Sequence, residues 1–132
     1  MRGTDWRAAC LIAGLLLSGG AGAAPQAGAA TAAQVEAGRR LFARCAGCHQ
    51  VGSNAGNVFG PHLNGIVGRR AGSVAGYAYS PAMKASTVVW SQQKLVDFIR
   101  DSDKVVPGNK MRFFNFMSEK QVREIVSYLA TH

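Results

Sequence analysis

The sequence has 132 residues, enough for one small domain and too few for several. Its 15 Lys and Arg residues outnumber 7 Asp and Glu residues, which gives a formal charge of +8. This basic balance indicates an acidic protein surface, an anionic membrane or nucleic acid as the partner, with simple solubility as the alternative. Because no five like charges follow one another, the charge is spread over the surface.

The first residues of the chain have the three parts of a secretory signal peptide. Arg2 and Arg7 make a basic start, an apolar run follows at residues 8–17, and Ala21-Gly22-Ala23 provides an Ala-x-Ala cleavage sequence. The apolar run is about 10 residues long, whereas a membrane-spanning helix needs roughly 20. We therefore expect a cleaved signal peptide rather than an uncleaved anchor.

This cleavage divides the chain into a signal peptide at residues 1–24, a flexible lead at 25–31 and one domain at 32–131. The exported domain is expected in the bacterial periplasm, and export argues against nucleic acid as its partner. Cys10 leaves with the signal, so two cysteines remain. A disulfide between cysteines only two residues apart would close a tiny loop and stabilise little, which favours a chemical role for them.

Capping patterns and apolar spacing predict three helices. The first follows a capping box at Thr31 and runs from about residue 32 into Cys45. The second follows the N-cap Ser91 and ends near residues 100–102, and the third follows a capping box at Ser118. Because no strand pattern is present, we expect an all-α fold of three to five helices joined by long loops.

Two glycine features need a tertiary explanation. Gly38 lies inside the first predicted helix, where glycine costs about 1 kcal/mol relative to alanine. We therefore expect another helix to approach it closely.

Residues 51–79 form a glycine-rich stretch of about 29 residues without a helical or alternating pattern, which is long for a loop in a compact domain. We expect a bound cofactor to organise this loop.

The stretch Cys45-Ala46-Gly47-Cys48-His49 admits three kinds of chemistry. A zinc site needs about four ligands, but the other domain histidines, His62 and His132, are far apart and show no metal-binding spacing. A thioredoxin-like dithiol requires a βαβ context, which this sequence does not offer. Cys-x-x-Cys-His is the attachment motif of c-type haem: two thiols add to the haem vinyl groups and the histidine binds the iron. We therefore predict one covalent haem c.

A methionine opposite the histidine would complete the iron coordination and raise the reduction potential. The candidates are Met83, Met111 and Met117, any of which could instead fill the core. Met111 is favoured because Pro107-Gly108 bends the chain just before it and could present the sulfur from the far side.

Together these residues resemble a class I cytochrome c of the mitochondrial type that is also found in bacterial periplasms. The resemblance runs from Gly38 to Leu129 and rests on several spaced motifs. They are Gly38 and Phe42 before CAGCH, GPHLNGIVGR at 60–69, GYAYS, VVW, VPGNKM ending at Met111, and Tyr128 with Leu129 in the last helix. The resemblance implies the class I cytochrome c fold, with helices and long loops wrapped around one covalent haem c on Cys45 and Cys48.

The resemblance also implies roles for individual side chains. The Pro61 carbonyl would accept a hydrogen bond from the His49 imidazole, which fixes the ring and increases its basicity as an axial ligand. Met111 would be the second axial ligand, and Phe113 would shield the haem edge. The haem propionates would be held by Arg69, Tyr79 and Trp90, with core filling as the alternative for the tryptophan and Arg70 as the alternative arginine.

The chain departs from the family on the Met111 side. The family commonly has tyrosine, threonine and asparagine where this chain has Phe98, Asn109 and Met83, and there these groups form a polar, water-linked patch. We expect a drier or rearranged pocket, which leaves the reduction potential open. His62 is expected at the surface rather than at the iron.

With both axial positions filled by the protein, the iron has no open site for a substrate. We therefore predict a soluble, monomeric one-electron carrier of a respiratory or photosynthetic chain, not an enzyme. By resemblance, its donor is a quinol–cytochrome c reductase and its acceptor a terminal oxidase or photosynthetic reaction centre. These partners would present acidic docking surfaces, and it would meet the membrane only through them. The basic docking candidates are Arg44, Lys84, Lys110 and Arg112.

Three other functions remain open. The same haem site would serve a subunit dedicated to one periplasmic dehydrogenase, which copurification would reveal. A displaceable Met111 would make an enzyme or gas sensor, and Phe98 favours this slightly because it has no hydroxyl to donate to the sulfur. A binding domain without haem is the third alternative, and covalent attachment of haem would exclude it.

Overall fold

The computed structural model describes residues 29–114 and 116–132 of the protein. The predicted signal peptide at 1–24 and most of the predicted lead at 25–31 lie outside these residues. The helices are α1 Ala32–Leu41, the 3₁₀ helix η1 Phe42–Arg44, α2 Pro81–Ala85, α3 Gln92–Arg100, α4 Ser102–Val105 and α5 Glu119–Leu129. Within the described ranges there is no strand, only an isolated antiparallel bridge between Arg70 and Val89, so the all-α prediction is confirmed.

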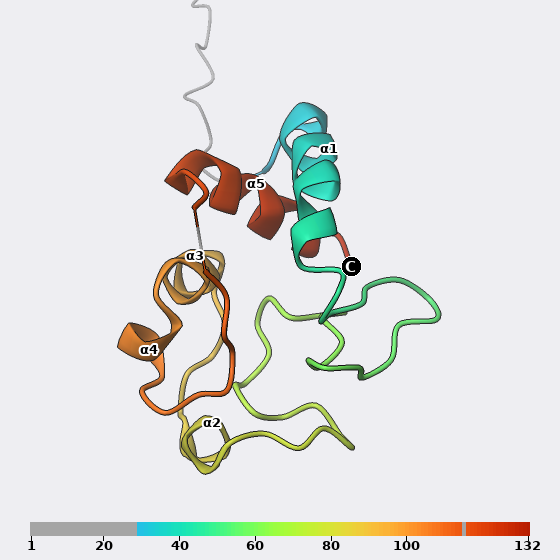
Figure 1. The fold of residues 1–132 in the computed structure, drawn as a ribbon. Helices are drawn as coiled ribbons and strands as arrows, with labels where there is room; N and C mark the ends of the chain where they lie inside the picture. The colour runs from blue at the N-terminus through green and yellow to red at the C-terminus, as the bar shows by residue number, and fades with distance from the viewer. Residues whose placement is uncertain (1–28, 115) are drawn as a thin grey trace, which may run out of the picture.

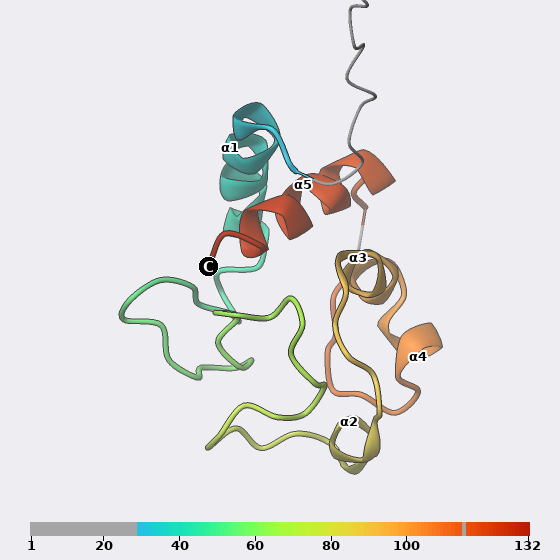
Figure 2. The same ribbon diagram turned by 180° about the vertical axis from the view of Figure 1, so that it is seen from behind.

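Helices α1 and α5 come from the two ends of the described chain and pack across each other above the rest of the molecule (Figure 1 and Figure 2). They meet at Gly38, where a Cβ atom would lie 1.9 Å from the carbonyl oxygen of Glu124. The rings of Phe42 and Tyr128 pack nearby, with centroids 5.5 Å apart. The close approach predicted at Gly38 is therefore confirmed, because only glycine lets the two backbones come so near.

The three predicted helices occur close to their predicted limits. Thr31 and Ser118 each form the predicted capping box, and the hydroxyl of Ser91 caps α3. The first helix tightens into η1 before it reaches Cys45, whose N–H donates to the Phe42 carbonyl at 2.8 Å. Such a tightened last turn is common at helix ends, and here it begins the turn that carries the CAGCH motif.

The short helices α2 and α4 lie in segments for which the sequence predicts no helix. The hydroxyl of Ser80 starts α2 by accepting from the Met83 N–H at 3.1 Å, and the carboxylate of Asp101 starts α4. With five and four residues, neither helix is long enough to show apolar periodicity in the sequence. Both matter for the site because α2 carries one candidate methionine and α4 precedes another.

Helices α3 and α5 supply the fully buried centre of the core, which includes Val96, Val122, Ile125 and Val126. The loop at residues 51–79 contains no helix or strand and lies below α1 in Figure 1. No helix in the described part of the chain is long and apolar enough to cross a membrane.

Side chains hold the long loop together where secondary structure does not. The amide of Asn64 donates to the Gly52 carbonyl and accepts from the Gly52 N–H, both at 2.8 Å. These two bonds pin the start of the loop to its middle.

Candidate haem pocket

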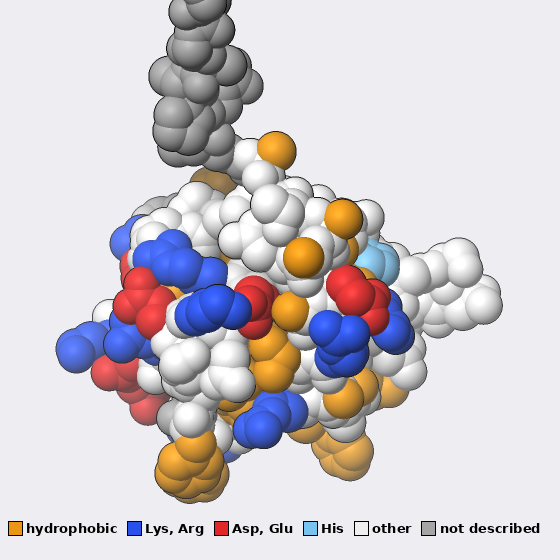
Figure 3. Space-filling model, turned by 90° about the horizontal axis from the view of Figure 1, so that it is seen from above, with side chains coloured by type: hydrophobic (Ala, Val, Ile, Leu, Met, Phe, Trp, Pro, Cys, Tyr) orange, Lys and Arg blue, Asp and Glu red, His pale blue; other side chains and the backbone are white. Residues whose placement is uncertain are grey.

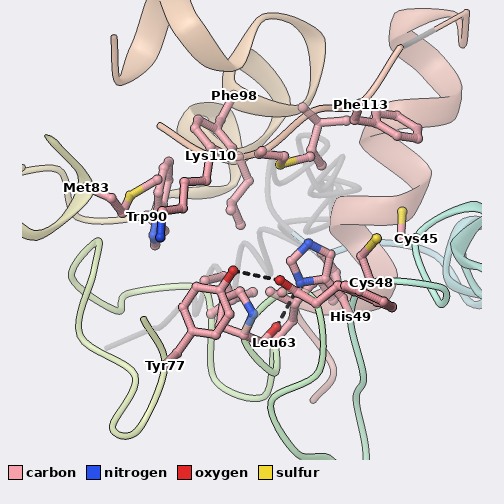
Figure 4. Close-up of a pocket in the computed structure, with 18 of the residues that line it drawn as sticks. Cys45, Cys48, His49, Leu63, Tyr77, Met83, Trp90, Phe98, Lys110 and Phe113 are labelled. Carbon is pink, nitrogen blue, oxygen red and sulfur yellow. Dashed lines mark hydrogen bonds between the residues drawn. The ribbon is translucent and has the colours of Figure 1, made fainter. Parts of the chain in front are cut away.

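The helices and the long loop enclose a cavity of about 350 Å³ with mainly apolar walls (Figure 4). Its walls come from the CAGCH turn, the loop at 51–79, α2, α3, the segment 110–113 and α5. Every site residue named from the sequence lines this one cavity. These residues are Cys45, Cys48, His49, Pro61, Arg69, Tyr79, Trp90, Met111 and Phe113.

The two cysteines lie together at one end of the cavity, and Met83 and Trp90 lie at the other (Figure 4). Neither cysteine is in a disulfide; Cys45 is partly buried and Cys48 is exposed. Burial, with a smaller contribution from Cys48, raises the pKa of the Cys45 thiol to about 11. Redox dithiols depend on a low thiol pKa, so this environment does not favour dithiol chemistry.

His49 follows the cysteines and turns its ring into the cavity. Its Nδ1 lies 2.8 Å from the Pro61 carbonyl oxygen, as the resemblance implies. Because a carbonyl only accepts, Nδ1 must carry the proton, and the lone pair of Nε2 is left to bind a metal. Burial lowers the pKa of His49, partly opposed by the bond to Pro61, so the imidazole is kept in the neutral form that metal ligation requires.

The methionine candidates fall into two groups. Met111 and Met83 both line the cavity, whereas Met117 lies in the hydrophobic core. Met111 follows the turn at Gly108, which has a positive φ of 81° that favours glycine. Phe98 and Met83 are buried, with 8% of their surfaces exposed, and place only apolar groups on this side of the cavity. The drier pocket expected from the sequence agrees with this lining.

Polar side chains gather in another part of the cavity wall. The Arg69 guanidinium donates to the carbonyls of Asn64 at 2.7 Å and His62 at 3.0 Å, which fixes its position. Arg70 also borders the cavity but is exposed, so Arg69 is the arginine with a defined place in the wall. Burial is the main cause that raises the pKa of Tyr79.

Trp90 is buried, with 5% of its surface exposed, and its ring packs against Phe98 at a centroid distance of 4.9 Å. Its backbone N–H donates to the Arg69 carbonyl at 2.9 Å. The tryptophan therefore belongs both to the core and to the cavity wall. Filling the core and facing a haem propionate, the two roles considered from the sequence, are compatible.

The cavity has further lining residues that the sequence reasoning does not assign to the site. The Tyr77 hydroxyl donates a hydrogen bond to the Phe59 carbonyl at 2.7 Å, and the Lys110 ammonium donates one to the Ala78 carbonyl at 2.9 Å. Gly60 lies against His49: a Cβ atom would be 2.4 Å from Cε1 of the ring. Its position in GPHLNGIVGR is the one sequence signal that could have drawn attention to it.

His62 does not line the cavity, and it lies at the surface with only part of its side chain exposed. The residue is partly buried, and its Nδ1 is enclosed without a hydrogen-bond partner among the described residues. Its carbonyl accepts from Arg69 and its N–H donates to Asn57, so its backbone is held on both sides. Only the surrounding loop decides this burial.

Comparison with known proteins identifies the fold. The Cytochrome c family model matches residues 35–132. Cytochrome c-550 of Nitrobacter winogradskyi is 41% identical over 73% of this chain and 88% of its own length. Cytochrome c2 of Blastochloris viridis is 37% identical over 76% of this chain and 79% of its own length.

The chain belongs to the cytochrome c family. Among solved structures, cytochrome cH from Methylobacterium extorquens matches with a TM-score of 0.68 and 40% identity, over 74% of this chain and 98% of that one. The class I cytochrome c fold expected from the motifs is thus confirmed. As a cytochrome c, the protein is a haem c electron carrier that interacts with redox partners, and it is not an enzyme.

The residues of the cavity fit a covalent haem c. Two unpaired thiols lie at one end, a neutral imidazole presents Nε2, and a thioether reaches the cavity from a different segment of the chain. A zinc site would lack ligands, because no group of three or more His, Cys, Asp and Glu side chains able to hold a metal ion occurs in residues 29–114 and 116–132.

Proposed function

We propose that the protein carries single electrons through a haem c joined to Cys45 and Cys48, with His49 and Met111 as the axial iron ligands. The observation that supports this most directly is that the CAGCH turn and Met111, far apart in the sequence, line the same cavity. When bound, the haem supplies an iron that gains and loses one electron. The His49 Nε2 and the Met111 sulfur would occupy both axial positions and leave none for a small-molecule substrate.

The remaining site residues would hold the haem periphery and its edge. Arg69, Tyr79 and Trp90 offer a guanidinium, a hydroxyl and an indole N–H, which are the donors that propionate groups need in a buried place. Phe113 would cover the haem edge, because it lines the cavity while its neighbours Phe114 and Phe116 are 86% and 91% exposed.

We further propose that the carrier works in the bacterial periplasm, after cleavage of residues 1–24 and with a lead at 25–31 and a domain at 32–131. The donor would be a quinol–cytochrome c reductase or, in the alternative, a periplasmic dehydrogenase, and the acceptor would be a terminal oxidase or a reaction centre. Apart from the dehydrogenase, these partners act in a respiratory or photosynthetic chain. The intact mass of the exported protein tests the cleavage: loss of residues 1–24 and gain of one haem are expected.

The experiment that tests the function is visible absorption of the exported protein, oxidised and reduced, together with a haem stain on a denaturing gel. Haem that stays with the denatured chain and a low-spin spectrum with the weak sulfur-to-ferric-iron band are expected. Covalent haem with a high-spin spectrum would instead mean that Met111 does not bind the iron. Absence of bound haem would overturn the proposal.

A further inference from the structure

The structure draws attention to Asn109, the least exposed of the buried polar residues in the described part of the chain. Only 1% of its surface is exposed, yet it does not line the cavity. Its side-chain oxygen accepts from the Met111 N–H at 2.8 Å. Its side-chain nitrogen donates to the Val106 carbonyl at 2.9 Å and to the Asp103 carboxylate at 3.1 Å. One side chain therefore connects Met111 to α4.

Apart from Asn109, the side chains that hold the backbone around Met111 are exposed or half-buried, such as Lys110, which donates to the Ala78 carbonyl at 2.9 Å. The segment turns at Gly108 and continues to α5 without helix or strand as far as it is described. The Met111 carbonyl accepts from the Ser102 hydroxyl at 3.4 Å and from the exposed Arg112 side chain at 3.1 Å. The bond from the Met111 N–H to Asn109 is the shortest of these, and Asn109 is the only fully buried side chain among these partners.

We propose that Asn109 is a positioning residue for Met111, which sets how readily the methionine leaves the iron. The inference rests on the proposed function, in which Met111 is an axial ligand. Removal of the Asn109 side chain leaves the Met111 N–H without its buried acceptor and frees the segment from α4, so open conformations become more populated. A small ligand binds only the open form, so its apparent affinity reports that population.

The test uses the haem-containing protein and imidazole as the external ligand. Imidazole binding to the oxidised protein is titrated by loss of the sulfur-to-ferric-iron band, for the unaltered chain and for Asn109→Ala. We expect Asn109→Ala to bind imidazole about tenfold more tightly, the effect of losing one buried hydrogen bond. Asn109→Thr, whose hydroxyl can still accept from the Met111 N–H but cannot also reach Asp103, should lie between the two.

The matched control is Asn64→Ala. This asparagine also makes a two-bond link within a loop, to Gly52, but on the His49 side of the cavity. It should lower the denaturant midpoint without changing imidazole affinity. Equal gains in affinity for Asn64→Ala and Asn109→Ala, or no gain for Asn109→Ala, would overturn the inference.

A second pair of variants decides the question if Asn109→Ala does not fold. Asp103→Ala removes the anchor on α4 and should increase imidazole affinity, whereas Asp103→Asn keeps an acceptor oxygen and should not. Equal affinities for these two variants would overturn the inference. Failure of the proposed function looks different, because the unaltered protein would then lack the sulfur-to-iron band before any substitution.

Discussion

The orientation of the His49 ring depends on two neighbouring residues in another segment. The Pro61 carbonyl binds the Nδ1–H and thereby directs Nε2 to the cavity. Gly60, just before it, is close enough that an alanine Cβ would lie 2.4 Å from the ring. The N–H of Gly60 donates to the Cys48 carbonyl at 2.7 Å, which ties this pair to the haem attachment turn.

At the residue scale, replacement of Met111 and Met83 separates the two methionines that line the cavity. Met111→Ala should abolish the sulfur-to-ferric-iron band and allow carbon monoxide to bind the reduced protein rapidly, because one axial position opens. Met83→Ala should keep the band and lower stability by about 2–5 kcal/mol, the usual cost of truncating a buried methionine. The reverse pattern in absorption spectra would assign the ligand to Met83.

At the element scale, the packing of α1 on α5 positions the haem attachment turn. Phe42 begins η1, and its ring packs at a tilt against Tyr128 of α5. This contact fixes where the CAGCH turn starts relative to α5. The short helices act similarly on the other side: α4 anchors the Met111 segment through Asn109, and α2 carries Met83 into the cavity wall. Short elements therefore position much of the site.

Gly38→Ala tests this helix contact. The added Cβ would meet the Glu124 carbonyl at 1.9 Å and the Tyr128 Cβ at 2.8 Å, and neither can move without shifting α5. We expect the free energy of unfolding to fall by about 3 kcal/mol, at the upper end of overpacking costs. Guanidinium titration of the haem-containing protein measures it. Gly56→Ala is the control, since its nearest neighbour would be 3.9 Å away; equal losses for both variants would contradict the prediction.

At the scale of the whole molecule, the cavity lies where a larger protein would have core side chains. The packed core covers one side of it through α3 and α5, while the glycine-rich loop closes another side with few buried apolar residues of its own. The haem would supply the missing apolar surface, so its attachment and the folding of the loop should be linked.

Removal of the attachment cysteines tests that linkage. Cys45→Ala/Cys48→Ala protein made without haem should show little helical signal in far-UV circular dichroism, because the cavity walls would have nothing to pack on. The haem-containing unaltered protein is the reference. A well-folded haem-free variant would mean that the loop is organised by its own hydrogen bonds, such as those of Asn64 and Arg69.

Charge is distributed unevenly over the molecule. On the face seen from above in Figure 3, Lys and Arg side chains lie beside Asp and Glu side chains. The ion pairs of α1 and α5, such as Arg39 with Glu36 and Arg123 with Glu119, account for this pairing. In contrast, five basic residues that line the cavity form no ion pair within the described chain: Arg44, Arg69, Arg70, Lys110 and Arg112.

This unpaired charge should guide anionic electron donors and acceptors to the cavity mouth. Arg44→Glu should slow oxidation of the reduced protein by ferricyanide several-fold at low ionic strength and much less at high salt, since salt screens exposed charges. Stopped-flow absorption measures the rate. Lys94→Glu makes the same charge change on an exposed residue that does not line the cavity and is not among the docking candidates. Equal slowing by both variants would indicate an effect of net charge alone.

Features that depend on neighbouring residues could be predicted from the amino-acid sequence alone. The capping boxes at Thr31 and Ser118 and the apolar spacing after them are local, so they specified α1 and α5 in advance. The CAGCH motif is also local, since the two thiols and the imidazole must reach one haem from consecutive turns. Resemblance to cytochrome c then named the distant residues that share the cavity.

Features that depend on residues far apart in the sequence could be seen only in the folded chain. The backbone of α5 explains Gly38, and the carbonyls of Asn64 and His62 hold the Arg69 guanidinium in place. The Nδ1 atom of His62 is enclosed, and the Asn109 side chain reaches Asp103 of α4. Residue spacing in the sequence predicts neither feature. The physical reason is that burial and hydrogen-bond partners are set by packing between segments, whereas caps and periodicity act within a few residues.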